Sequence, residues 1–310
     1  MSANLRVAVI GVGHLGQHHA RILAAMDGVD LVGVVDARHE RAQEIAGRYG
    51  TTAFTDAREL QDGVDAVTVA VPTRMHLDIA LPFLERRVAA LVEKPLASSL
   101  DEADRMIAAA GQHGAVLAVG HTERFNPAVE AARPLIANPR FIEVHRLGTF
   151  PERSLDIDVI FDVMIHDLDV LLSIVRSEVA SVEAVGVKVL TPRTDIANVR
   201  IRFASGCIAN LTASRISRDR VRKIRFFQHD AYVSIDYAAR DVEVYRLVRQ
   251  NGRPSIEGGR LPVAADEPLR RELADFIDAA RGQRQPGVTG RQGRDALALA
   301  TLIAERMQEA

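Results

Sequence analysis

One lysine is the strongest candidate for chemistry in this chain. Lys94 lies in the tripeptide Glu93-Lys94-Pro95, directly after the apolar run Val88–Val92. The chain has only three lysines among its 39 basic residues, so an ammonium group at this position is unusual. An ammonium group can be desolvated, shift its pKa and exchange a proton, whereas a guanidinium cannot. Because open α/β sheets bind ligands at the carboxyl ends of their strands, Lys94 is predicted to lie at a ligand site.

A second candidate pair consists of Asp162 and His166. They are four residues apart in a segment with helical periodicity, so they are expected to share one face of a helix. A carboxylate beside an imidazole fixes the tautomer of the ring and raises its basicity. An ordinary pair of polar residues on a helix has the same spacing, so the pair by itself does not identify a catalytic site.

Together these three side chains meet the needs of alcohol oxidation by a nicotinamide cofactor. The reaction requires a base for the hydroxyl proton and a positive or hydrogen-bonding group for the developing alkoxide. Lys94 and His166 are predicted to divide these two roles, and Asp162 to orient the imidazole. The sequence leaves open which of Lys94 and His166 is the immediate base.

A glycine-rich turn predicts where the dinucleotide binds. Gly11, Gly13 and Gly16 follow the first predicted strand and open the first predicted helix, the context in which this spacing holds a pyrophosphate. Asp36 ends the second strand, twenty residues after Gly16, where a carboxylate binds the ribose 2′-hydroxyl. Asp36 favours NAD over NADP, although Arg38 follows closely and would soften its repulsion of a 2′-phosphate.

Other residues are predicted to border the cofactor. His14 and Leu15 lie inside the glycine turn, and Pro72 and Thr73 follow the strand Val64–Val71. His76 is expected either to cap the next helix or to reach the cofactor. The full set of predicted cofactor-binding residues is Gly11, Gly13, His14, Leu15, Gly16, Asp36, Arg38, Pro72, Thr73, His76, Glu93 and Lys94.

The first 120 residues alternate between apolar strands and amphipathic helices. This alternation predicts a Rossmann-type, doubly wound parallel sheet within an α/β fold. The predicted strands are Arg6–Ile10, Leu31–Asp36, Val64–Val71, Ala89–Val92 and Val116–Gly120, and the predicted helices are His14–Met26, Arg38–Tyr49, Met75–Arg86 and Leu100–His113.

The remainder predicts an α+β domain with a large, open, mainly antiparallel sheet. Asn251–Gly259 is expected to be a polar loop. Residues 1–121 are assigned to the dinucleotide-binding domain and 122–310 to a substrate-binding and oligomerisation domain, with helix 291–307 able to pack back on the first. The other predicted elements are helices at Pro127–Ala137, Val159–Val175, Pro268–Arg281 and Arg291–Met307, and strands at Phe141–Leu147, Ala197–Phe203, Cys207–Ala213, Tyr232–Tyr237 and Val242–Leu247.

Composition excludes several classes of protein. The net charge of −2 gives no general attraction to nucleic acid or to an anionic membrane. No apolar stretch reaches the roughly 18 residues that span a bilayer, and no secretory leader is recognised. Cys207 is the only cysteine, so no intrachain disulfide forms. No Cys/His cluster has the spacing of a metal site, and a cytoplasmic location is expected.

Four motifs in order resemble the Gfo/Idh/MocA oxidoreductases. They are Gly11-x-Gly13-x-x-Gly16, Val71-Pro72-Thr73-x-x-His76, Glu93-Lys94-Pro95 and Asp162-x-x-x-His166. The resemblance covers nearly the whole chain and implies NAD(P)-dependent oxidation or reduction of a sugar or polyol hydroxyl. It also implies that Lys94 is the central catalytic residue, that His166 is the general acid/base, and that Asp162 positions the substrate.

Two further stretches resemble one branch of that family. Residues 120–129 and 161–169 are similar to the enzymes that oxidise the C3 hydroxyl of UDP-N-acetylglucosamine, whose product receives an amine on the way to lipid A. A diphosphate substrate needs cationic donors. The predicted substrate-binding residues are Arg124, Asn126, Arg153, Asp162, His166 and Arg215.

Two alternatives concern the substrate and the function, and one further prediction concerns assembly. The same chemistry on a free sugar, inositol or another polyol is the nearest rival. A non-catalytic NAD-binding sensor or scaffold is a rival of another class. The uncovered face of the large sheet predicts a homodimer or homotetramer, in part from the family resemblance.

Overall fold

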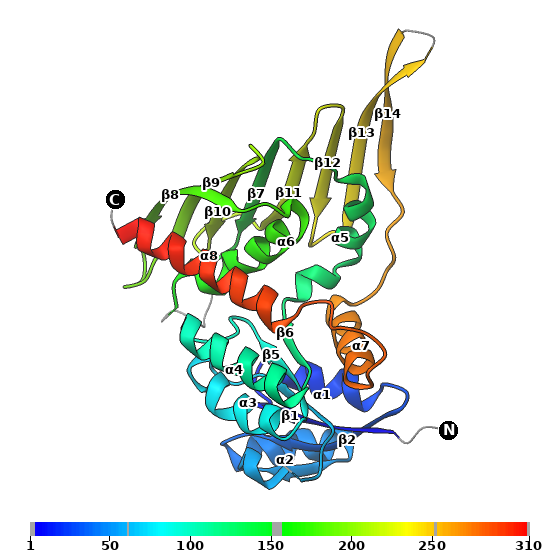
Figure 1. Cartoon of the computed structure of the whole chain (residues 1–310), viewed down its shortest axis with the longest axis vertical. Helices are drawn as coiled ribbons and strands as arrows, with labels where there is room; N and C mark the ends of the chain where they lie inside the picture. The colour runs from blue at the N-terminus through cyan, green and yellow to red at the C-terminus, as the bar shows by residue number, and fades with distance from the viewer. Residues whose placement is uncertain (1–3, 61, 151–156, 251–252, 309–310) are drawn as a thin grey trace. The chain divides into compact units, whose positions relative to one another are not determined.

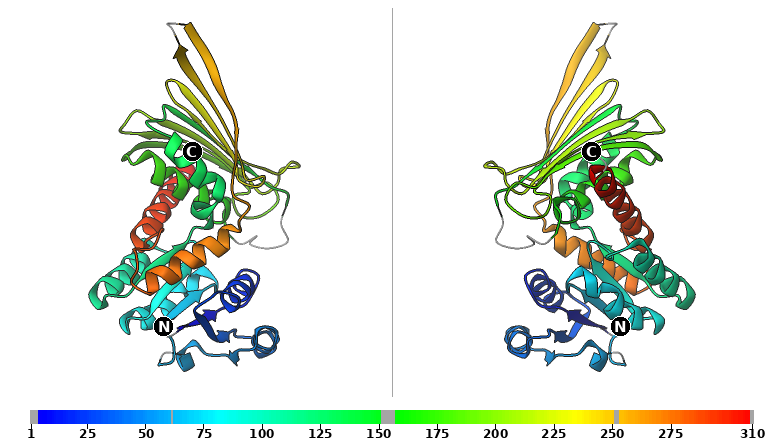
Figure 2. Two further views of the ribbon diagram at one scale, coloured as in Figure 1. Left: turned by 90° about the vertical axis from the view of Figure 1, so that its right-hand side faces the viewer. Right: turned by 90° about the vertical axis from the view of Figure 1, so that its left-hand side faces the viewer.

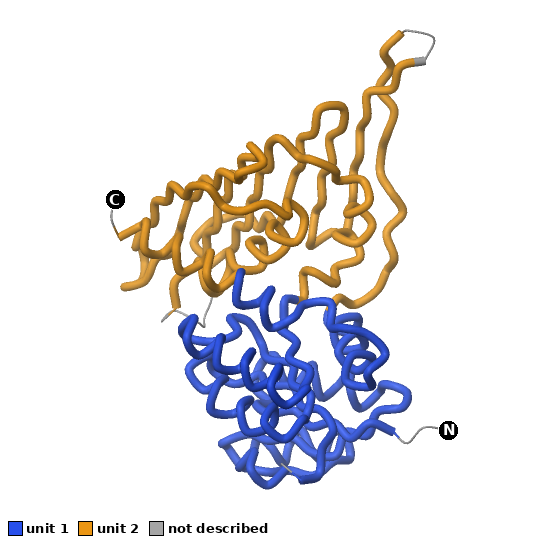
Figure 3. The backbone as a smooth tube through the Cα atoms, viewed as in Figure 1, with its two compact units in different colours: residues 1–121, 269–295 blue, residues 122–268, 296–310 orange. Residues whose placement is uncertain are grey.

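The computed structural model describes residues 4–60, 62–150, 157–250 and 253–308. The chain forms two compact units (Figure 3). The first contains residues 1–121 and 269–295, and the second contains residues 122–268 and 296–310. Residues 269–295 thus belong to the first unit, although they are far from residue 121 in the sequence.

A six-stranded, entirely parallel sheet forms the centre of the first unit, in the order β3-β2-β1-β4-β5-β6. This order confirms the predicted doubly wound sheet. Strands β4 and β5 are buried along their whole length, as their continuous apolar sequences require. The strands are β1 (Leu5–Ile10), β2 (Val29–Val35), β3 (Thr52–Phe54), β4 (Ala66–Val69), β5 (Ala89–Glu93) and β6 (Leu117–Gly120).

Helices pack against this sheet through apolar side chains. Ala20 and Leu23 of α1 and Phe276 of α7 share one core with Val7 and Val9 of β1. The helices of the first unit are α1 (Gly16–Ala24), α2 (His39–Tyr49), α3 (His76–Glu85), α4 (Leu100–His113), α7 (Pro268–Ala280, of which Pro268 belongs to the second unit) and the first residues of α8 (Gly290–Gln308). Strand β3 was not predicted because three residues are too few to show an alternating pattern.

An eight-stranded sheet forms the second unit, in the order β14-β13-β12-β11-β7-β10-β9-β8. All neighbours are antiparallel except β7 and β10, which confirms the predicted open, mainly antiparallel sheet. The strands are β7 (Phe141–Leu147), β8 (Val179–Val187), β9 (Ile196–Phe203), β10 (Ile208–Ser214), β11 (Val221–Phe227), β12 (Ala231–Asp236), β13 (Asp241–Gln250) and β14 (Arg253–Leu261).

Helices cover only one face of this sheet. Figures 1 and 2 show α5 (Pro127–Ala132), α6 (Ile165–Val175) and most of α8 on the same side of the strands. Strand β9 has the matching pattern, since Val199 and Ile201 are buried in the core while Arg200 and Arg202 are exposed on the other face. The opposite face of the sheet therefore lacks a covering helix among the described residues.

Two predictions about secondary structure outside the candidate site were wrong. Asn251–Gly259 was expected to be a loop, but Arg253–Leu261 forms β14, an edge strand paired along its length with β13. The sequence shows no alternating pattern here, because the strand is held by backbone hydrogen bonds to β13 and buries few side chains. A side chain at Gly258 would lie 2.0 Å from the carbonyl oxygen of Val244, so the tight pairing requires glycine there.

The other error concerns a helix end. The helix predicted to end at Ala137 ends at Ala132, and a 3₁₀ turn, Arg133–Leu135, follows. Pro134 has no N–H to continue the α-helix, and its ring disfavours helical backbone at the preceding residue. No described helix is both long enough and apolar enough to cross a membrane.

Candidate active-site residues

The carboxyl edge of the parallel sheet gathers the predicted cofactor residues of the first unit. The strand order reverses between β1 and β4, which makes this the topological switch point of the sheet, the usual ligand position in such folds. Four loops leave this edge: the glycine turn after β1, Asp36 after β2, Pro72 and Thr73 after β4, and Lys94 after β5.

The glycine turn has a backbone that suits a pyrophosphate. Gly11 has φ of 84°, and a side chain there would lie 2.6 Å from the Ala70 carbonyl oxygen. A side chain at Gly16 would lie 1.8 Å from the Gly11 carbonyl oxygen, so both positions need glycine for packing. No atom lies within 4 Å of the position that a side chain would take at Gly13, which leaves the backbone there open to a ligand.

Two further features make this turn suitable for an anion. His14 and Leu15 are exposed, and no side chain caps the start of α1 among the described residues, so its first N–H groups can bind phosphate. Asp36 accepts hydrogen bonds from the Val12 N–H at 3.3 Å and the Arg38 N–H at 3.0 Å, which fixes its carboxylate beside the turn. These residues fit a nicotinamide dinucleotide.

His76 connects two of the loops at this edge. Its Nε2 lies 3.0 Å from the Val71 carbonyl oxygen, and its Nδ1 lies 3.0 Å from that of Pro95. Burial lowers the pKa of His76, although its bonds to backbone carbonyls oppose this shift. A neutral imidazole carries one N–H, so His76 donates to one loop at a time. The side chain therefore braces the loop that follows Lys94.

A buried histidine–carboxylate pair lies directly beside Lys94. Nε2 of His19, on α1, is 3.1 Å from Oε1 of Glu93, and the Lys94 N–H donates to the other oxygen at 3.2 Å. Burial alone raises the pKa of Glu93, but the hydrogen bond with His19 and the charges of His19 and Lys94 lower it below its usual value. A side chain at Gly120 would lie 3.0 Å from this carboxylate, so glycine leaves room for it.

Lys94 itself is half-buried and is joined to Pro95 by a cis peptide bond. The neighbouring Glu93 is held on both carboxylate oxygens, so the backbone at Lys94 has little freedom.

In the second unit, Asp162 lies in a π-helical turn, Ile160–Met164, and His166 lies in the first turn of α6. The sequence predicted one regular helix through both residues. The wider π turn changes the angle between Asp162 and His166 relative to a regular helix, although both side chains are half-buried as expected for site residues. Such turns interrupt α-helices frequently at functional sites.

A buried arginine holds the residue next to His166. Arg146 of β7 donates from Nη2 to Asp167 at 2.8 Å and from Nη1 to Glu123 at 2.9 Å. Its guanidinium carbon lies 4.8 Å from the centre of the Tyr237 ring. Burial raises the pKa of Asp167, which the positive charge of Arg146 opposes. Asn126 completes the cluster by donating to Glu123 at 3.0 Å.

Arg124, predicted to bind substrate, forms a two-point ion pair with Asp169 of α6. Its Nε donates to Oδ2 at 2.9 Å and its Nη2 to Oδ1 at 2.5 Å, and the arginine side chain is only 9% exposed. Arg124 thus bonds directly to Asp169, and the adjacent residue Glu123 is joined to Asp167 through Arg146. We infer that these ion pairs fix the start of α6.

Two other predicted substrate residues are also held inside the second unit. Asn126 is buried and caps α5, accepting a hydrogen bond from the Ala128 N–H at 3.1 Å. Arg215 is buried and donates from Nε to Asp195 at 2.9 Å. Contacts of Arg124, Asn126 and Arg215 with substrate stay predictions, and Arg153 lies outside the described residues.

The sequence did not identify the buried partners of these site residues. Arg146 and Tyr237 belong to no motif, and Asp167, although it lies within residues 161–169, was not singled out as a site residue. One signal existed for His19. A carboxylate at the end of a fully apolar strand such as β5 needs a partner, and His19 lies on the apolar face of α1. Among the described residues, no three His, Cys, Asp or Glu side chains form a group that could hold a metal ion.

Comparison with protein families identifies both units. Residues 5–121 match the oxidoreductase family with an NAD-binding Rossmann fold, and residues 136–232 match the GFO/IDH/MocA C-terminal domain. The chain belongs to the Gfo/Idh/MocA family of oxidoreductases. It is an oxidoreductase that acts on a CH–OH donor with a nicotinamide cofactor.

Individual relatives are similar over nearly the whole chain. A UDP-N-acetylglucosamine 3-dehydrogenase from Acidithiobacillus ferrooxidans is 38% identical, covering 97% of this chain and 96% of the relative. Its solved structure matches with a TM-score of 0.92 over 99% of both chains, at 36% identity. A scyllo-inositol 2-dehydrogenase from Bacillus subtilis is 30% identical, covering 93% of this chain and 90% of the relative.

Proposed function

We propose that this oxidoreductase uses NAD to oxidise the C3 hydroxyl of UDP-N-acetylglucosamine to a ketone. The observation that carries the proposal is the 38% identity to the Acidithiobacillus enzyme over almost the full length of both proteins. The inositol dehydrogenase relative is 30% identical over a smaller share of both chains. The 3-keto product is suited to an aminotransferase, which replaces a ketone with an amine.

In the proposed mechanism, His166 accepts the C3 hydroxyl proton and Lys94 stabilises the alkoxide that forms. Bound NAD would accept the hydride from C3. The fixed backbone around Lys94 supports its role, because a positive group stabilises developing charge best when it is already in place. Asp162 positions the substrate or the His166 ring. Lys94 as the immediate base remains the alternative.

The choice of NAD over NADP rests on Asp36. Its carboxylate is 12% exposed and is fixed beside the glycine turn by two backbone N–H groups. A ribose 2′-hydroxyl can donate to this carboxylate, whereas a 2′-phosphate would be repelled by it. Arg38 lies 3.5 Å from the same carboxylate and reduces that repulsion only in part.

The proposal also includes binding of the substrate diphosphate. Arg124 and Arg215 each bond to a buried carboxylate, so their charge is largely balanced within the protein. A diphosphate needs charge that is not balanced in this way. Among the predicted substrate-binding arginines, Arg153 should therefore be substituted first in tests of diphosphate binding.

A direct assay tests the substrate. The purified protein is incubated with NAD and UDP-N-acetylglucosamine while NADH absorbance is followed, with an aminotransferase and glutamate present to remove a 3-keto product. We expect NADH to form with the sugar nucleotide and not with N-acetylglucosamine alone. NADH formation with myo- or scyllo-inositol but not with UDP-N-acetylglucosamine would replace the proposal with the polyol alternative.

We also propose that the uncovered face of the eight-stranded sheet binds a second copy of the chain. A row of aromatic rings crosses this face on adjacent strands, from Phe141 through Phe227 and Tyr232 to Tyr245, with ring centres 5.3–6.3 Å apart. Tyr245 is 42% exposed at the end of this row, and a contiguous exposed apolar surface is typical of a protein–protein contact. Light scattering should give a dimer or tetramer, and a monomer at micromolar concentration would exclude this assembly.

A further inference from the structure

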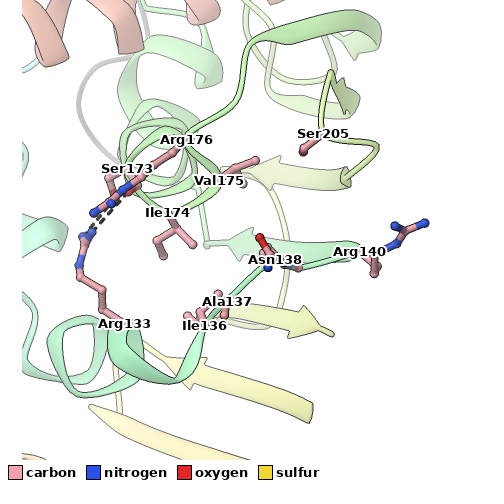
Figure 4. A pocket seen from close by; sticks show the side chains of 11 residues that line it. Arg133, Ile136, Ala137, Asn138, Arg140, Ser173, Ile174, Val175, Arg176 and Ser205 are labelled. Atoms are coloured by element: carbon pink, nitrogen blue, oxygen red, sulfur yellow. Dashed lines mark hydrogen bonds between the residues drawn. The ribbon is translucent and has the colours of Figure 1, made fainter. Parts of the chain in front are cut away.

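A cavity of about 630 Å³ lies in the second unit at the C-terminal end of α6. Its walls come from the segment after the Arg133–Leu135 turn, from the last turn of α6, and from Ser205 between β9 and β10 (Figure 4). His166 lies at the other end of α6. At 1.5 Å per residue, it is roughly 10–15 Å along the helix from this cavity, which is therefore separate from the proposed catalytic residues.

The walls of this cavity are positively charged. They include Arg133, Arg140 and Arg176, and none of the lining residues is an aspartate or a glutamate. Figure 4 shows the side chains of Arg133 and Arg176 converging near Ser173, while Arg140 points toward the opposite side. In the described part of the chain, no carboxylate pairs with Arg140 or Arg176.

Arg133 is held in place by neutral groups only. It donates from Nη2 to the Ser173 hydroxyl at 3.1 Å and from Nη1 to the Ser173 carbonyl oxygen at 3.4 Å. Burial, together with the charges of Arg124 and Arg176, lowers the pKa of Arg133 although Asp169 and Glu130 oppose this. Burial is the largest cause of this shift and the nearby arginines add to it, while none of the residues that line the cavity is a carboxylate.

The C-terminus of α6 does not supply the missing negative charge. A helix end carries about half an elementary charge, which is small beside three guanidinium groups. Arg133 donates a hydrogen bond to the Ser173 carbonyl oxygen at this helix end. Arg176 and Arg140 remain exposed to the cavity and to solvent. A bound anion would balance this charge.

The shape and chemistry of the cavity favour a phosphate group. Guanidinium groups bind phosphate oxygens in pairs of parallel hydrogen bonds. Asn138 and Ser205 add polar side chains, and Ile174 and Val175 add a small apolar surface. The volume lies within the range of about 300–1,000 Å³ that is usual for small-molecule sites. A small phosphorylated metabolite meets all of these conditions.

We propose that this cavity is a second ligand site, in which Arg133 and Arg176 bind the phosphate of a small phosphorylated metabolite and Arg140 lies at its rim. The site is independent of the proposed sugar-nucleotide chemistry. The cavity lies against the C-terminal end of α6, the helix that carries His166 in its first turn, so a ligand there is placed to modulate the enzyme.

The test is calorimetric titration of the full-length protein with pyrophosphate, with NADH present in excess so that the glycine turn is occupied. Arg176→Gln removes an exposed arginine that has no carboxylate partner, so the variant should fold. We expect it to bind pyrophosphate about tenfold more weakly or worse, because hydrogen bonds between charged groups are lost. Arg202→Gln, an exposed arginine on β9, should bind like the unaltered protein.

Several results would overturn the proposal. These are absence of pyrophosphate binding, equal binding by Arg176→Gln and Arg202→Gln, or equally strong binding of malonate, which would remove the preference for phosphate. Location is tested by soaking crystals with tungstate, which mimics phosphate and scatters anomalously. A peak beside Arg133 and Arg176 would support the site, and peaks only elsewhere would exclude it.

Discussion

The two units bury different kinds of polar side chain. In the described part of the first unit, the buried polar residues include His19, His76 and His121 but no arginine or lysine. In the second unit they include Arg146 and Arg215, each bonded to an aspartate that is itself almost fully buried. The described arginines of the first unit are at least partly exposed, as in the pair of Arg6 with Asp65.

This difference has an energetic consequence. An imidazole or a carboxylate can change its protonation state when its partner is lost, so the cost of burial is limited by its pKa. Replacing Arg146 removes a permanent positive charge from two carboxylates at once, those of Asp167 and Glu123, whereas replacing His19 leaves only Glu93 without its partner. The second unit should therefore be much more sensitive to loss of a single buried partner.

The largest expected effect comes from Arg146→Met. The substitution keeps the side-chain volume but leaves the carboxylates of Asp167 and Glu123 without their cation. We expect the free energy of unfolding to fall by about 3–5 kcal/mol, as for other buried pairs that lose one partner. Urea denaturation measures this loss.

Arg225→Met is the matched control. Arg225 pairs with Glu143 on the same sheet, but both side chains are about one third exposed. Exposed pairs contribute about 0–1 kcal/mol. If Arg146→Met destabilised the protein no more than Arg225→Met, the buried cluster would not be what holds α6.

An intermediate effect is expected for Asp195→Asn, and it should depend on pH. Asp195 is buried, which by itself raises its pKa, but hydrogen bonds from the backbone of Leu190 and Thr191 and from Arg215 lower it below the usual value. The stabilisation is therefore complete above the unfolded pKa near 4 and is lost as pH falls below it. At pH 7 the variant should lose about 2–3 kcal/mol.

Thermal unfolding of the unaltered protein and Asp195→Asn at pH 7 and pH 3 measures this dependence. The difference in melting temperature should shrink at the lower pH. A difference that stays constant would mean that the ionised carboxylate is not the source of the stabilisation.

The smallest effect is expected for His19→Leu in the first unit. Glu93 loses its imidazole partner but keeps the Lys94 N–H and can take up a proton, so we expect a loss of about 1–3 kcal/mol at pH 7. Because the folded pKa of Glu93 is lowered, its stabilisation is present at neutral pH and is lost as pH falls through the acid range.

Denaturation at pH 7 and pH 4 tests this, with His18→Leu as control, since the ring of His18 contacts His14 and not a carboxylate. A larger loss for His19→Leu than for Arg146→Met would reverse the comparison between the units.

The sequence predicts the first unit well because its signals are local. Glycine spacing after β1, apolar strands and Lys94 after β5 each occur within a few consecutive residues. Strand β14 and the π turn at Ile160–Met164 have no such signal. The first forms only because β13 lies beside it, and the second depends on packing around the start of α6.

The partners of the site residues were hidden for a related reason. Arg146 bonds to residues 21 and 23 positions away along the chain, and Glu93 to one 74 positions away. This chain is rich in arginine, and its sequence does not show which arginines are buried against a carboxylate and which lie at the surface. Arg124 illustrates this. It was predicted to bind substrate because of its charge, and the structure shows that it bonds to Asp169.

The most direct test of the account is the Lys94→Met variant, measured for both turnover and cofactor binding. With UDP-N-acetylglucosamine and NAD, kcat/KM should fall by a factor on the order of 10³ or more, since the charge that stabilises the alkoxide is lost. NADH binding, followed by fluorescence titration, should change by no more than about twofold, because the glycine turn and Asp36 are intact. A variant that kept its turnover, or that lost NADH binding in proportion to activity, would contradict the catalytic role of Lys94.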